Sequence, residues 1–364
     1  MEKLKLRAYD GIALTGLLML PALFSTELSK LAEQNNTAAW IALLIASIIM
    51  LCLFLIAACL MGRYEGKNII EITSIVMGRP FGIIYGVALG VYFCYFTGIQ
   101  IRESAEILKI YGLSLTPIYI VAGLILLTAV IMNFLGGRAI VKSAGLFYII
   151  VILGIVFIML LGLNRYNPDN LIPLLGNGMA DITTNSLFIT SIFDSVIILF
   201  LFAPAFSNTV KMKKSGVLSI ALTAAACILL YLCFVMMFSP SVASKMMSGF
   251  IEMGKSSYYN RFFSRFESSL LFFLIFSSAM LASIGLFVTK ESFACTFKLR
   301  PSKAFTIICV VPILIAIIIP TNTLELTQKY LPVIRRYSVA FMAGFPVLVL
   351  IVSTIKRIFK YEKS

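Results

Sequence analysis

The stretch GIALTGLLMLPALFST, residues 11–26, is uncharged from end to end and lies between Asp10 and Glu27. A helix needs about 20 apolar residues to cross the hydrocarbon core of a bilayer, so these 16 residues form a short span. They also contain Pro21, which has no backbone N–H and interrupts helical hydrogen bonding. The stretch therefore predicts a membrane span that is broken near its middle.

A second interrupted stretch lies in the other half of the chain. The run ITTNSLFITSIF, residues 182–193, is separated by Asp194 from the uncharged run 195–210, which contains Pro204. A charged side chain at membrane depth is costly and usually faces a cavity or a partner. This stretch therefore predicts a second broken span.

Eight further uncharged runs, each 19 to 30 residues long, complete the pattern. The chain is 60% apolar and 13% charged, whereas soluble chains are about 45–50% apolar and about 25% charged. This excludes a soluble enzyme, a disordered tail and a secreted disulfide scaffold. We expect an all-α integral membrane protein with ten transmembrane helices in one domain, 1–364. The eight runs are 34–62, 80–101, 110–137, 143–164, 215–244, 268–289, 304–324 and 337–355.

The two broken spans are the first and the sixth, so each one opens a half of five spans. An odd number of spans makes the two halves inverted with respect to each other, and paired broken helices in inverted repeats indicate a transporter-type central site. We expect repeat one at about 10–163 and repeat two at about 182–358. The alternative is that glycine and proline are simply common in membrane helices.

Catalytic chemistry has few candidates in this sequence. The chain has no histidine, and its seven cysteines show no metal-site spacing. It also lacks a nucleotide-binding glycine loop and a nucleophile motif. We therefore expect neither an enzyme nor an ATP-driven pump, and no catalytic residue, metal site or cofactor.

The net charge of +14 indicates membrane orientation rather than nucleic-acid binding. Ten spans place 19 of the 30 lysines and arginines on the side of the two termini and nine on the other side, and Arg102 and Arg265 lie near span ends. Basic residues gather in cytoplasmic loops. Both termini are therefore expected in the cytoplasm.

Charged residues at the outer ends of spans three and eight form a candidate ion-pair cluster. Arg102, Glu103 and Glu106 close span three, and Arg265 and Glu267 open span eight. Both groups carry two signs at the same membrane level, so we expect Arg265 to pair with Glu103 or Glu106, or Glu267 with Arg102. The alternative is that these long side chains extend separately to water.

The broken spans supply candidate ligand groups. Near Pro21, free N–H groups and carbonyls at the helix ends would hold the two charges of a zwitterion. Asp194 either binds an ammonium group or a cation, or lies in an outward-facing turn within a water-filled vestibule. Tyr92 in span three and Ser277 and Ser278 in span eight either line the same space or serve ordinary helix packing.

Three motifs resemble the B subunits of spore germinant receptors. RESAEILK at 102–109 resembles the end of that family's third span, DNLIPLLGNG at 169–178 the loop before its sixth, and SRFESSLL at 264–271 the start of its eighth. The resemblance covers nearly the whole chain, in order and at matching spacing.

The resemblance implies the amino acid–polyamine–organocation transporter fold, with spans one and six discontinuous. It implies a sensor of small nutrients such as amino acids in the inner membrane of bacterial endospores, with a larger A subunit and a lipoprotein C subunit as partners. The alternatives are an ion-coupled amino acid transporter and a membrane scaffold without a ligand. Carried over by position, the ligand pocket comprises Leu20, Pro21, Ala22, Leu23, Tyr92, Phe193, Asp194, Ile197, Ile198, Ser277 and Ser278.

Overall fold

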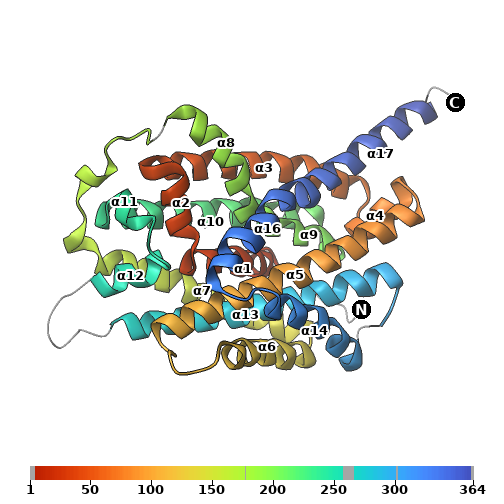
Figure 1. The fold of residues 1–364 in the computed structure, drawn as a ribbon. Coiled ribbons are helices and arrows are strands. Elements are labelled where there is room, and N and C mark those ends of the chain that lie inside the picture. The colour runs from red at the N-terminus through yellow and green to blue at the C-terminus, as the bar shows by residue number, and fades with distance from the viewer. Residues whose placement is uncertain (1–4, 177, 257–265, 301, 362–364) are drawn as a thin grey trace.

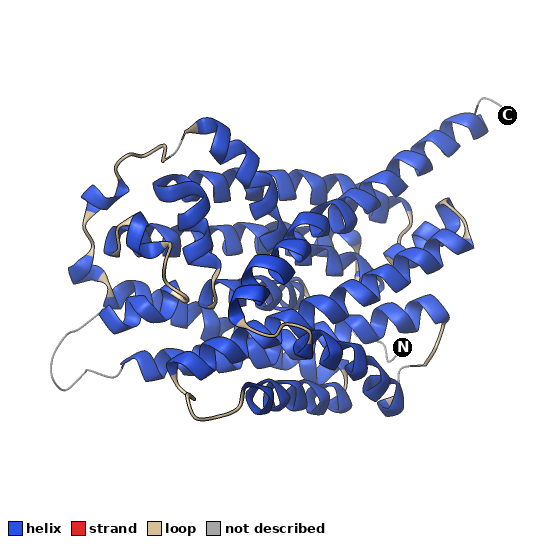
Figure 2. Ribbon diagram, in the orientation of Figure 1, coloured by secondary structure: helices blue, strands red, loops and turns tan. Residues whose placement is uncertain are grey.

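The computed structural model describes residues 5–176, 178–256, 266–300 and 302–361, and these ranges are helical almost throughout (Figure 2). Within them, eight helical segments are long and apolar enough to cross a membrane, and two shorter apolar helices are Ala8–Phe24 and Lys303–Ile318. The prediction of an all-helical membrane protein is thereby confirmed. The eight segments are Glu27–Arg63, Arg79–Tyr111, Ile118–Leu135, Gly137–Arg165, Met179–Leu201, Thr209–Met237, Ser269–Phe297 and Leu326–Ile358.

The helical elements follow one another with short connections (Figure 1). The first half consists of α1 (Ala8–Met19), η1 (Leu20–Phe24), α2 (Glu27–Asn35), η2 (Asn36–Ala38), α3 (Ala39–Arg63), α4 (Ile69–Val76), α5 (Arg79–Tyr111), α6 (Ile118–Leu135), α7 (Gly137–Leu161), η3 (Leu163–Arg165) and η4 (Pro168–Leu171). The second half consists of α8 (Met179–Ile189), η5 (Thr190–Ile197), α9 (Ile198–Leu201), η6 (Ala203–Ala205), α10 (Thr209–Met237), α11 (Pro240–Ala243), α12 (Gly249–Ser256), α13 (Phe266–Phe297), α14 (Lys303–Ile318), α15 (Thr323–Glu325), η8 (Leu326–Tyr330), α16 (Leu331–Val339), η9 (Ala340–Gly344) and α17 (Phe345–Tyr361).

The first helix is interrupted beside Pro21. The α-helical geometry of α1 ends at Met19, the segment η1 is a 3₁₀ helix, and α2 resumes at Glu27. The first apolar helix, Ala8–Phe24, ends close to the sequence-based limit at residue 26. Helix α2 begins at Glu27, whose side chain is buried and forms an ion pair, and it leads into the next long segment, Glu27–Arg63.

The sixth span changes its geometry around Asp194. Helix α8 ends at Ile189, and the next eight residues, Thr190–Ile197, form the 3₁₀ helix η5. Runs of 3₁₀ helix longer than three or four residues are uncommon, because their hydrogen bonds are poorly aligned. The Asp194 carboxylate therefore lies on a segment that departs from α-helical geometry, as the α1–η1–α2 region does near Pro21.

The last long helical segment contains two π-helical turns. These turns, η8 and η9, lie on either side of α16. The apolar run predicted this span at 337–355, whereas the helix already includes Arg335 and Arg336 in α16. π-turns inside helices often mark functional positions, because they rotate side chains out of the regular register.

Helices α5 and α13 lie along each other in the middle of the bundle (Figure 1). Helix α14 packs on the same side of α5, where Gly98 meets it closely. A Cβ atom at Gly98 would lie 2.5 Å from the Ala316 Cβ and 2.8 Å from the Ile313 carbonyl oxygen. A backbone carbonyl cannot rotate away as a side chain can, so glycine allows this close helix contact.

The two chain ends lie at the same end of the bundle, and α11 and α12 lie at the opposite end (Figure 1). Near the N-terminus, the Leu6 amide donates to the Ala205 carbonyl at 2.9 Å, and Leu6 forms an isolated parallel bridge with Phe206. The segment before α1 is thereby joined to the segment after the sixth span.

Candidate functional site

A small cavity lies between the break in the first span, the 3₁₀ segment η5 of the sixth span and α16. Its volume is about 40 Å³, enough for a few water molecules and far below the roughly 300–1,000 Å³ that is typical of ligand pockets. Leu18, Met19 and Ala22 contribute an apolar wall from α1 and η1, and Phe96 contributes one from α5. The polar side chains that line it are Glu27, Gln100, Ser191, Asp194, Ser195 and Arg335.

Asp194 is held by two hydroxyl groups. The Tyr92 hydroxyl donates to Asp194 Oδ2 at 2.6 Å, and the Ser195 hydroxyl donates to Oδ1 at 3.1 Å. Asp194 is only 2% exposed. Hydrogen bonds to a buried carboxylate reduce the cost of its desolvation. Asp194 therefore presents an oriented acceptor to the cavity from η5, and the predicted residues Tyr92 and Asp194 are in contact.

An ion pair between Arg335 and Glu27 closes the cavity on the side of α2 and α16. The Glu27 side chain is 5% exposed and the Arg335 side chain 19% exposed, so the pair is largely withdrawn from solvent. It joins two residues that are 308 positions apart. The pair therefore ties α2, which directly follows the break at Pro21, to α16 in the last long segment.

Two more charged groups lie near this pair. The Thr26 amide and hydroxyl donate to Glu103 Oε1 at 3.3 and 2.5 Å, and they connect the first break to α5. The Lys30 ammonium group is buried and has no hydrogen-bond partner among the described residues. A buried ammonium without a partner is unfavourable, so Lys30 is available to pair with a carboxylate if the surrounding helices move.

The charged residues at the end of α5 form contacts with two neighbouring segments. The Arg102 guanidinium pairs with Glu106 at 3.0 Å, and the Thr323 hydroxyl donates to Glu106 Oε2 at 3.0 Å. Arg102 and Glu103 are both buried. Arg265 and the side chain of Glu267 lie outside the described residues, so the expected lock between spans three and eight stays a prediction.

Most of the other predicted pocket residues do not line this cavity. Ser277 and Ser278 donate to the Leu274 carbonyl within α13, at 2.9 and 2.6 Å, so their hydroxyls are already satisfied in their own helix. Among the predicted residues, Ala22 and Asp194 line the cavity. The other members are buried in η1, η5 and α9: Leu20, Pro21, Leu23, Phe193, Ile197 and Ile198. Their role in binding stays a prediction.

Sequence reasoning missed Glu27, Gln100 and Arg335 as parts of this site. Glu27 and Arg335 were assigned to the ends of apolar runs, because charge is the usual sign that a span has ended. The available signal was their opposite charge at the ends of the first and last spans. Gln100 lies two residues before Arg102. It is uncharged, so the charge pattern of this stretch does not single it out.

The comparisons with known proteins agree on one family. Residues 6–325 match the family described as "Spore germination protein". Spore germination protein KB of Bacillus subtilis (strain 168) is 22% identical over 359 residues, which are 95% of each chain. Spore germination protein A2 of the same organism is 28% identical over 191 residues, which are 52% of each chain.

Several solved structures share the fold. MhsT in complex with L-phenylalanine gives a TM-score of 0.67 at 13% identity, covering 94% of this chain and 87% of that chain. Mhp1, a nucleobase-cation-symport-1 family transporter, gives a TM-score of 0.66 at 12% identity, covering 93% and 77%. The transporter fold expected from the sequence motifs is thereby confirmed.

Proposed function

Because the chain belongs to the spore germination protein family, we propose that it is the membrane subunit with which a spore germinant receptor senses a small nutrient. The chain is an integral membrane protein with a transporter fold, from a family whose members are not enzymes. We further propose that the nutrient is an amino acid. The partners would be the A and C subunits of such a receptor, and the location would be the spore inner membrane.

The proposed arrangement in the membrane has ten spans in two inverted halves, about 10–163 and 182–358. The helices Ala8–Phe24 and Lys303–Ile318 would complete the eight longer segments. An even number of spans requires both termini on one side, which agrees with the position of the chain ends in Figure 1. The excess of basic residues supports the cytoplasm as that side.

One observation carries the proposed binding mode: Asp194 and Arg335 line the same cavity from η5 and α16. A carboxylate and a guanidinium on opposite elements match the ammonium and the carboxylate of an amino acid. The apolar residues at the first break, with Ala22 at the cavity, would contact its side chain. The nutrient would then be an amino acid with an apolar side chain rather than a charged one.

The same geometry provides a route from binding to conformational change. Arg335 already pairs with Glu27, so the carboxylate of the nutrient would have to take the place of Glu27. Losing that pair would release α2 from α16 and let the cavity widen. A ligand shifts a conformational equilibrium only through different affinities for the two states. The replacement of Glu27 by the nutrient carboxylate at Arg335 supplies this difference in affinity. The A and C subunits would respond to the movement of the helices.

The test is the dose response of germination in spores whose single receptor contains this chain. An amino acid that triggers germination is first identified from the 20 standard ones. Ala22→Leu fills the cavity and is expected to raise the half-maximal concentration at least about tenfold, at unchanged protein level. Ala225→Leu, on the exposed face of α10, is the matched control. Equal responses of the two variants would reject the central site.

An ion-coupled amino acid transporter is the second candidate, because the structures that share this fold are described as transporters. A sensor needs only two conformations, whereas a transporter must also complete a cycle and release its substrate on the other side. Uptake of the labelled amino acid into vesicles that contain this protein alone would establish transport. Binding without uptake would support the sensor.

A further inference from the structure

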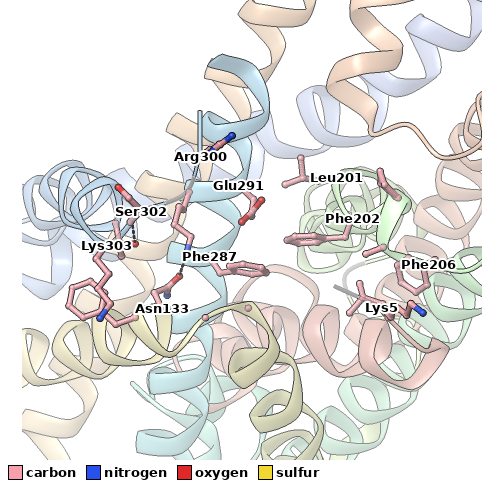
Figure 3. Close-up of a pocket in the computed structure, with 18 of the residues that line it drawn as sticks. Lys5, Asn133, Leu201, Phe202, Phe206, Phe287, Glu291, Arg300, Ser302 and Lys303 are labelled. Atoms are coloured by element: carbon pink, nitrogen blue, oxygen red, sulfur yellow. Dashed lines mark hydrogen bonds between the residues drawn. The ribbon is translucent and has the colours of Figure 1, made fainter. Parts of the chain in front are cut away.

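A much larger cavity opens at the end of the bundle that holds both chain termini (Figure 3). Its volume is about 920 Å³, within the range of roughly 300–1,000 Å³ that is typical of ligand pockets. Its walls come from the segment before α1, the junction of α6 and α7, the segment after α9, the end of α13 and the start of α14. It shares no lining residue with the small cavity at Asp194.

The charges in this cavity are mainly positive. Lys5, Lys290, Arg300 and Lys303 line it, and Glu291 is the one carboxylate among the described lining residues. Lys290 and Glu291 are adjacent on α13, and neighbours in sequence point in different directions on a helix. Among the described residues Glu291 forms no ion pair or hydrogen bond with Lys290, although its charge acts on the ammonium group from nearby, so the direct contact positions of the ammonium group stay open to an anion. The cavity has a net charge of about +3, which favours an anionic occupant.

Lys290 is a buried cation held in place by its neighbours. It is 5% exposed, and its Nζ donates to Asn133 Oδ1 at 3.2 Å. The Asn133 amide nitrogen in turn donates to the carbonyls of Ala129 and Ser283, at 2.9 and 3.0 Å, which fixes its oxygen toward the lysine. An ammonium group has three donors, and Asn133 is the one hydrogen-bond partner of Lys290 among the described residues. Two donors are thus left for a ligand.

An apolar surface lies beside this cation. The rings of Phe202 and Phe287 stack with centroids 5.2 Å apart and an interplanar angle of 8°. Both rings line the cavity (Figure 3), and the Lys290 Nζ lies 5.4 Å from the centroid of Phe287. Arg300 and Lys303 are exposed at the rim. The cavity therefore combines a buried cation, an aromatic wall and a basic entrance.

We propose that this cavity is a second binding site, for an organic anion whose carboxylate or phosphate group pairs with Lys290 while its apolar part packs on Phe202 and Phe287. Snorkelling explains exposed lysines at a membrane surface, but it does not explain an ammonium group that is fixed by an oriented amide inside a cavity. The anion is either a free metabolite or the headgroup of an anionic lipid, since both present the same acidic groups. This site does not depend on the proposed nutrient site.

The experiment uses the full-length protein in nanodiscs of phosphatidylcholine alone. Thermal unfolding is followed with citrate and with inorganic phosphate, against sodium chloride at equal ionic strength. A ligand that binds the folded state raises the unfolding temperature with its concentration, so citrate is expected to stabilise the wild type more than chloride does. Lys290→Met should raise the half-saturating citrate concentration at least about tenfold. Lys211→Met, an exposed lysine outside the cavity, should behave as the wild type.

A second arm separates the two sources of the anion. In discs with one third phosphatidylglycerol, a lipid ligand would stabilise the wild type but not Lys290→Met, and it would abolish the effect of citrate. A free metabolite site would leave the citrate effect intact. Should Lys290→Met not fold, Arg300→Gln at the exposed rim is expected to weaken citrate binding about threefold. The proposal is overturned if citrate, phosphate and phosphatidylglycerol stabilise the wild type no more than chloride does, or stabilise the variants equally.

Discussion

Substituting Glu27 by glutamine should make the proposed sensor more sensitive to its nutrient. The substitution keeps the size of the side chain and removes the charge that holds Arg335. In the proposed mechanism the nutrient carboxylate must displace Glu27, so a receptor without this competitor needs less nutrient. A purely structural ion pair predicts the opposite, because loss of a buried partner would only lower the amount of folded protein.

The magnitude follows from the burial of the pair. Removing one partner of a fully buried pair costs about 3–5 kcal/mol, and an exposed pair contributes about 0–1 kcal/mol. Here one side chain is 5% exposed and the other 19% exposed, so we place the contribution near 2 kcal/mol. Each 1.4 kcal/mol corresponds to a factor of ten, and the half-maximal nutrient concentration should therefore fall by up to about 30-fold.

The assay is the loss of optical density of spore suspensions over a range of nutrient concentrations, with the protein level checked by immunoblot. Glu33→Gln, on the exposed face of the same helix, is the matched control and should leave the response unchanged. Arg335→Gln should shift the response in the other direction, because it removes the partner of the nutrient carboxylate. Unchanged or lower sensitivity of Glu27→Gln at normal protein level would refute the partner exchange.

Three further predictions use other parts of the structure. Asp194→Asn should raise the half-maximal nutrient concentration at least about tenfold. Tyr92→Phe should raise it only a few-fold, because this substitution removes one hydrogen bond to the Asp194 carboxylate. Equal dose responses of both variants and the wild type would exclude Asp194 as the ammonium partner. Gly98→Val should lower the yield of folded protein on size-exclusion chromatography, because a Cβ atom at this position already lies 2.8 Å from the Ile313 carbonyl oxygen. Gly123→Val should not lower the yield, since no atom lies within 4 Å of a Cβ at Gly123. Similar yields of the two variants would show that α5 and α14 can separate. Ser241 and Lys67 are both exposed, so a cysteine at either position can be labelled in a cysteine-free background. Ser241→Cys should react with a membrane-impermeant thiol reagent from the outside, and Lys67→Cys only from the cytoplasm. The reverse labelling pattern would invert the proposed topology.

The sequence was sufficient to locate the helix break beside Pro21 and the change of helix geometry at Asp194. Pro21 and the isolated Asp194 act locally, through a missing backbone donor and through the cost of a charge at membrane depth. Both effects are visible in a short stretch of residues. Tyr92 and Asp194 were each candidates for the same pocket, but their hydrogen bond joins residues 102 positions apart and no local pattern predicts it.

The outer part of the site depended on a contact that the sequence does not reveal. Glu27 and Arg335 read as the ends of apolar runs, and only their mutual pairing over 308 positions makes their burial tolerable. Ser277 and Ser278 illustrate an ambiguity that the sequence alone does not resolve. A buried serine in a helix either faces a ligand or donates to its own backbone three or four residues back, and the sequence pattern is the same in both cases.

The small volume of the cavity at Asp194 affects the nutrient concentration at which the proposed sensor responds. At about 40 Å³ the cavity has no room for an amino acid, so only the fraction of molecules that has widened can accept one. The apparent dissociation constant equals the intrinsic constant divided by that fraction. If one molecule in about a thousand is widened, a micromolar intrinsic affinity becomes a millimolar response. Substitutions that never touch the nutrient, at any helix contact that differs between the two shapes, would then tune the concentration at which a dormant cell responds.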